Sequence, residues 1–262
     1  MYKILSELLS DKKGDVIFEC FNLWHYLYMA VIFGAIIGVI LLLRKKSEKA
    51  KRRAADVAVG IALGLYALDF FLMPFAYGEI HIEKLPFHVC TAMCVMCFLS
   101  RRVRFLEKFK GQLALLGFLS NLIYVLYPAG VMWCQIHPLS YRAVQTLMFH
   151  GAMTAYGIFV LVFGEVKLNW KKCYKELAVI GGMTAWALIG NILYDGHVGD
   201  YSYDANWFFL VRDPLSVIPA DISPYVLPFV VIAAFFAAEM LIYLVYYLVC
   251  KIAYKAKKKE AS

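Results

Sequence analysis

A histidine and a cysteine stand two residues apart in the stretch LPFHVCT, residues 85–91. Pro86 suits the first turn of a helix, because the N–H group that proline lacks would have no partner there. His88 and Cys90 then lie in that turn, where the helix terminus and an imidazole both favour the reactive thiolate of a cysteine. Because residues two apart point in different directions on a helix, His88 is a poor base for Cys90. His150, from a later apolar segment, is the better candidate.

More polar side chains fall near one expected edge of the membrane. They are the six histidines, His25, His81, His88, His137, His150 and His197, together with Asp69, Cys90, Asn121, Tyr124, Asn191 and Tyr194. A polar group inside hydrocarbon is expensive, so this one-sided collection predicts a functional site in a cavity that opens outward. The alternative is structural: asparagine and tyrosine side chains also join helices by hydrogen bonds. Cys94 and Cys97, spaced like one face of a helix, are typical of a packing seam.

The sequence gives little reason to expect a metal, a cofactor or a framework of disulfides. Four positions carry residue types that could bind zinc: Asp69, His88, Cys90 and His150. No two of them are spaced to place two ligands on one helix, so we expect no metal site. We also expect no cofactor. Of the seven cysteines, only Cys20 and Cys134 share the expected outer side, so the sequence allows one disulfide, between these two residues.

The elements that must position these residues are apolar helices. The chain of 262 residues is 62% hydrophobic, with a mean hydropathy of +0.66, and about 20 mostly apolar residues cross a bilayer. Seven stretches qualify: 22–43, 55–77, 84–100, 111–128, 143–164, 176–195 and 225–250. We therefore predict an all-α protein, a single seven-transmembrane-helix bundle over residues 1–262. Residues 1–21 are expected to lie in the interface as a short amphipathic segment, and residues 251–262 to form a basic tail.

The distribution of lysine and arginine predicts the orientation. Of the 27 basic residues, 21 fall in four segments, 44–53, 101–110, 165–175 and 251–262. Because short basic segments stay in the cytoplasm, the N-terminus is expected outside and the C-terminus inside a multi-pass protein of the cell membrane. The net charge of +8 then reflects topology and contact with anionic lipid. We expect membrane lipids as partners and do not expect nucleic acid. No feature of the sequence indicates a protein partner.

Several motifs occur in an order that resembles a known family. They are LPFHVCTAMCVMCFLS (85–100), NLIYVLYPAGV (121–131), LMFHGAMTAYGIF (147–159), NILY (191–194), NWFFLVRDP (206–214) and SPYVLPF (223–229). The chain resembles the YwaF-type family of seven-helix integral membrane proteins over about residues 55–245. Distant animal relatives of that family include an acyltransferase that moves fatty acyl chains between phospholipids through a cysteine embedded in a helix. The resemblance implies this role for Cys90, assisted by His88 or His150.

Our leading interpretation is therefore lipid-directed acyl transfer with a cysteine nucleophile. Cys90 would attack, His150 would be the base, and Asp69 would orient His150. Asn121 and Asn191 would donate hydrogen bonds to an oxyanion or a head group. Tyr124, Tyr194 and Asn206 complete the expected substrate-binding residues.

Two other interpretations remain open. A transporter or binding protein for a small polar or cationic solute would use Asp69 and Glu239, two carboxylates well inside apolar stretches, and the aromatic residues near the outer edge. A structural or assembly protein would fill the cavity with its own side chains.

Overall fold

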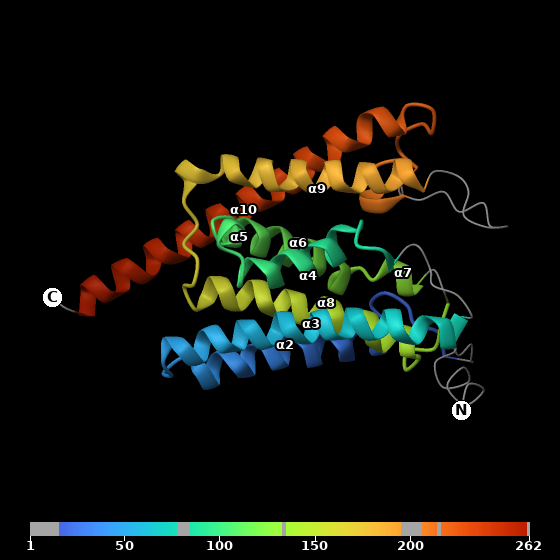
Figure 1. Ribbon diagram of the computed structural model, residues 1–262. Coiled ribbons are helices and arrows are strands. Elements are labelled where there is room, and N and C mark those ends of the chain that lie inside the picture. Colours follow the sequence, from blue (N-terminus) through green and yellow to red (C-terminus); the bar gives the residue numbers. More distant parts are fainter. Residues whose placement is uncertain (1–15, 78–83, 133–134, 195–205, 214–215, 261–262) are drawn as a thin grey trace. The chain divides into compact units, whose positions relative to one another are not determined.

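The computed structural model describes residues 16–77, 84–132, 135–194, 206–213 and 216–260 (Figure 1). Every regular element in these ranges is helical, which confirms the all-α class. The chain divides into two compact units, Met1–Glu165 and Val166–Ser262, and each is described by itself. The single bundle expected from the sequence stays a prediction.

The first unit is organised around its last helix. Its elements are α2 (Leu23–Leu43), α3 (Glu48–Tyr77), α4 (Val89–Ser100), α5 (Arg104–Glu107), α6 (Lys110–Leu126), α7 (Ala129–Met132) and α8 (Tyr141–Val162). Helix α8 packs against α2, α3 and α6, and α4 packs against α3 and α6 (Figure 1). Side chains on α8 can therefore meet side chains from several neighbouring helices.

Glycines let α8 approach its neighbours closely. A Cβ atom at Gly157 would lie 2.3 Å from Cβ and 3.1 Å from Cα of Phe118 on α6. A Cβ atom at Gly151 would lie 2.9 Å from a side-chain carbon of Ile32 on α2. Small residues at helix crossings commonly allow the backbones of membrane helices to approach closely. The crossing at Gly157 fixes the spacing of the two helices that carry Asn121 and His150.

An ionic cluster joins four helices of the first unit at one end. Arg101, which follows α4, pairs with Asp56 on α3 and donates to Glu165 beyond α8, with Nη1 3.1 Å from Oε2. The Nζ of Lys110, at the start of α6, lies 2.8 Å from the same oxygen of Glu165. Burial lowers the pKa of Arg101, but the hydrogen bond that Arg101 donates to Asp56 and the charge of Glu165 outweigh burial and raise that pKa above its ordinary value.

The second unit is a pair of long helices with two short turns of 3₁₀ helix. It contains η2 (Trp170–Lys172), α9 (Tyr174–Leu193), η3 (Trp207–Phe209) and α10 (Ser223–Glu260), and α9 packs against both η3 and α10 (Figure 1). The basic tail expected at 251–262 continues α10 as far as Glu260. Of the amphipathic segment expected at 1–21, residues 1–15 lie outside the described residues, as do His81, Cys134 and His197.

The expected seven spans become six candidate spans and one shorter helix within the described ranges. The six are Leu23–Leu43, Glu48–Leu72, Lys110–Met132, Tyr141–Val162, Tyr174–Leu193 and Ser223–Ile252. The expected span at 84–100 is instead α4, a helix of 12 residues. At 1.5 Å per residue α4 is about 18 Å long, which is too short to cross a hydrocarbon layer of about 30 Å alone. The turns around Pro86 delay its start to Val89, so the count of seven is not confirmed.

Candidate functional site

The centre of the site is a buried contact between His150 on α8 and Asn121 on α6. Nδ1 of His150 lies 2.8 Å from Oδ1 of Asn121, and both side chains are buried. The Nδ2 group of Asn121 donates to the backbone oxygen of Gly117 at 2.7 Å, so its Oδ1 faces the imidazole. An amide oxygen only accepts hydrogen bonds, so Nδ1 of His150 carries the proton and Nε2 carries the lone pair. Asn121 thereby sets the tautomer of a potential base.

Aromatic rings hold the plane of the imidazole. The centroid of the Tyr124 ring lies 3.8 Å from that of His150 with an interplanar angle of 31°, and the Phe149 ring lies edge-on at 4.9 Å. Thr154, one turn further along α8, donates to the backbone oxygen of His150 at 2.8 Å. A ring held on two sides keeps one orientation, which acid–base catalysis requires.

Cys90 lies beside the same segment of α6. It is the second residue of α4, and its Sγ lies 3.8 Å from the backbone oxygen of Ser120, the residue before Asn121. His88 is the N-cap of α4 but makes no side-chain capping bond. The first N–H groups of a helix have no partner within the helix, so the start of α4 offers donors next to the thiol.

Asp69 and Lys84 form an ion pair near the imidazole. Lys84 Nζ lies 2.8 Å from Oδ2 of Asp69, and the backbone oxygen of Lys84 accepts a bond of 2.7 Å from the Tyr66 hydroxyl. Lys84 and His88 both lie close enough to His150 to interact with it electrostatically. The partner expected for Asp69 was His150; in the structure, Lys84 pairs with Asp69 and Asn121 contacts His150.

Three predicted residues lie in the second unit, where they hold a loop. Asn191 donates to the backbone oxygen of Trp207 at 3.1 Å and accepts from its N–H at 2.8 Å, and the Tyr194 ring meets the Trp207 ring edge-on. Asn206 accepts from the N–H groups of Val211 and Arg212, both at 3.0 Å. Asn191 and Asn206 thus use their amides to hold the backbone at Trp207, Val211 and Arg212.

The comparison with protein families gives one result. A model described as the TMEM164 family matches residues 20–254. The chain belongs to the TMEM164 family. Neither the comparison with curated proteins nor that with solved structures gives a match. The TMEM164 family match spans every helix described above up to the last turns of α10, so both units belong to the family's common region. The protein is accordingly a membrane protein with several candidate spans.

Other polar residues of this TMEM164 family member have structural roles. The N–H of Phe21 donates to Nδ1 of His25, and Nε2 of His25 lies 2.9 Å from the backbone oxygen of Val125, so His25 links the start of α2 to the end of α6. Nδ1 of His137 accepts from the N–H of Leu139. Cys94 and Cys97 are fully buried between helices, which fits a packing seam.

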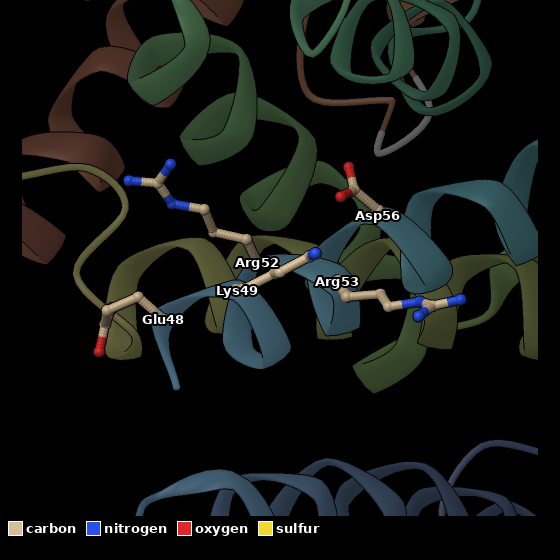
Figure 2. A pocket seen from close by; sticks show the side chains of 5 residues that line it. All are labelled: Glu48, Lys49, Arg52, Arg53 and Asp56. Atoms are coloured by element: carbon tan, nitrogen blue, oxygen red, sulfur yellow. The ribbon is translucent and has the colours of Figure 1, made fainter. Parts of the chain in front are cut away.

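An open hollow of about 510 Å³ lies at the start of α3. Its lining residues are Glu48, Lys49, Arg52, Arg53 and Asp56, and all are exposed (Figure 2). Arg52 and Arg53 point away from one another, so the hollow does not present converging charges (Figure 2).

Sequence reasoning missed two residues of the site. Lys84 was not among the expected site residues, although one basic residue beside an apolar segment that carries a carboxylate is a signal for an ion pair. Ser120 gave no signal, because its contribution is a backbone oxygen.

Proposed function

We propose that the protein transfers acyl chains between membrane lipids through a thioester on Cys90. The proposal places it in the cell membrane with its N-terminus outside and its C-terminus in the cytoplasm. Membership of a family of membrane proteins supports the proposal. So does the resemblance of the sequence to a family whose distant animal relatives include a cysteine-dependent acyltransferase.

The observation that carries the proposal is the arrangement of cysteine, histidine and asparagine. Asn121 bonds Nδ1 of His150, which leaves the lone pair on Nε2 as the base. Cys90 lies against the backbone oxygen of the residue that precedes Asn121. A thiol, an imidazole and an amide that orients the imidazole recur in unrelated thiol enzymes. Asn121 therefore takes the orienting role that the sequence analysis gave to Asp69.

The first half of the proposed reaction acylates the enzyme. His150 accepts the proton of the Cys90 thiol, and the sulfur attacks the carbonyl carbon of an ester in the donor phospholipid. The N–H groups at the start of α4 stabilise the negative charge that develops on the carbonyl oxygen. The C–O ester bond breaks, His150 returns the proton to the leaving oxygen, and a lysophospholipid departs.

The second half reverses these roles. The hydroxyl of an acceptor lysophospholipid gives its proton to His150 and attacks the thioester carbon. The C–S bond breaks, the thiol regains its proton from His150, and the acceptor leaves as a new phospholipid. No oxidant, reductant or nucleotide is needed, because a thioester and an ester exchange one acyl group.

Replacement of the thiol tests the proposal. The full chain is placed in vesicles with a phospholipid that carries an isotope-labelled acyl chain and an unlabelled lysophospholipid. Cys90→Ala should reduce transfer of label to the level of protein-free vesicles. Cys94→Ala, one turn along the same helix, is the matched control and should retain transfer. Full transfer by Cys90→Ala would refute the covalent mechanism.

The same preparation distinguishes the transport interpretation. Asp69 is paired with Lys84, so a solute would have to displace that lysine. Uptake of a cationic solute that collapses in Asp69→Asn and is unchanged in Cys90→Ala would favour transport over acyl transfer.

A further inference from the structure

A buried carboxyl group on α10 has no use in the chemistry above. Glu239 is fully buried, and neither of its carboxylate oxygens has a hydrogen-bond partner in the part of the chain that the structure describes. Nor does any ion pair within those ranges include it. An isolated ionised carboxylate in such surroundings costs many kcal/mol, so a charge on Glu239 needs a neutralising partner.

A second buried acid makes a negative charge on Glu239 still less favourable. Glu176, in the first turn of α9, is also fully buried and lies close enough to interact electrostatically with Glu239. The Tyr243 hydroxyl donates to Oε1 of Glu176 at 2.6 Å, and Tyr243 lies one turn after Glu239 on the same face of α10. The Trp170 ring covers the Tyr243 ring, with centroids 5.4 Å apart. Two carboxyl groups and a phenol therefore form one buried cluster within the second unit.

The two acids differ in how well each holds a negative charge. Glu176 receives a hydrogen bond from Tyr243 and lies at the N-terminus of α9, where the helix dipole favours an anion. Glu239 lies within α10, where neither of these effects is available. Two neighbouring carboxylates in a site of low dielectric do not both ionise, so the pair retains one proton, and Glu239 is the group that keeps it.

We propose that Glu239 and Glu176 form a proton-binding site, in which Glu239 holds the proton, Glu176 is ionised and Tyr243 donates to Glu176. The ligand is one proton, held on a carboxyl oxygen of Glu239. Tyr243 keeps its own proton throughout. The site is independent of Cys90 and of the proposed acyl transfer.

Infrared spectroscopy of the full chain in lipid nanodiscs at neutral pH tests this assignment. A protonated carboxyl group has a carbonyl stretch that an ionised carboxylate lacks and that shifts in deuterated water. The wild-type spectrum should contain such a band, and Glu239→Gln should lose intensity equal to one carboxyl group per chain. Asp221, an exposed acid of the same unit, provides the control, and Asp221→Asn should leave the band unchanged.

A second variant keeps the test decisive if Glu239→Gln does not fold. Glu176→Gln should retain the protonated band at a shifted frequency, because Glu239 keeps its proton but loses its charged neighbour. Absence of a protonated carboxyl band in the wild type would overturn the proposal, since both acids would then be ionised and would need a metal cation. A band that disappears in Glu176→Gln would also overturn it, because the proton would then lie on Glu176.

Discussion

The replacement of Gly157 by alanine should destabilise the first unit, because the crossing of α6 and α8 has no room for a methyl group. The new Cβ would lie 2.3 Å from Cβ and 3.1 Å from Cα of Phe118, whereas carbon atoms in contact are about 3.5–4.0 Å apart. Rotation of the Phe118 side chain moves neither atom, so the helices must separate. Overpacking of a core lowers the free energy of unfolding by up to about 3 kcal/mol, and we expect the upper value here. Alanine returns about 1 kcal/mol of helix propensity, which leaves a net loss of about 2 kcal/mol.

Thermal unfolding of the full chain in detergent, followed by tryptophan fluorescence, measures this loss. About 2 kcal/mol corresponds to a decrease in Tm of roughly 4–8 °C for a chain of this length. Gly60→Ala is the matched control, because a Cβ atom at Gly60 on α3 meets nothing within 4 Å. That variant should keep or raise the Tm. Equal Tm values for the two variants would refute the close packing of α6 and α8, and with it the spacing that brings Asn121 to His150.

Three further variants probe the site itself. Lys84→Met leaves the buried carboxylate of Asp69 without its partner and should cost about 3 kcal/mol, at the lower end for a buried pair because the Lys84 side chain is 31% exposed. The double variant Lys84→Met with Asp69→Asn should recover most of the lost Tm, and no recovery would argue against the pair. Asn121→Ala removes the group that orients His150, so acyl transfer should fall about 10–100-fold in kcat with little change in KM. A change confined to KM would instead indicate that Asn121 binds substrate.

The helices could be predicted from the sequence because their signal is local. Runs of about 20 apolar residues define six of the seven expected spans, and the described helices overlap each of them. The expected span at 84–100 is wrong in length, because the helix begins at Val89 and not in the turn around Pro86. Leu85, Pro86 and Phe87 are apolar but lie in the turn before the helix, and hydropathy alone does not distinguish such residues from helical ones.

The site could be predicted only in part, because partners are set by the packing of distant segments. His150, Asn121 and Cys90 were identified by residue type and by their expected depth. They lie on α8, α6 and α4, and α6 packs against each of the other two. Which oxygen faces His150 depends on the crossing of α6 and α8, and no local pattern encodes that crossing. Asp69 was expected to contact His150. In the structure Asp69 pairs with Lys84, and Asn121 contacts His150.

Mass spectrometry of the intact protein after incubation with a labelled phospholipid, without any acceptor, tests the central claim most directly. The account predicts one labelled acyl group on the peptide that contains Cys90, removable by hydroxylamine and absent from Cys90→Ala. A protein that transfers acyl chains without any label on Cys90, or with the label on Cys94, would contradict it.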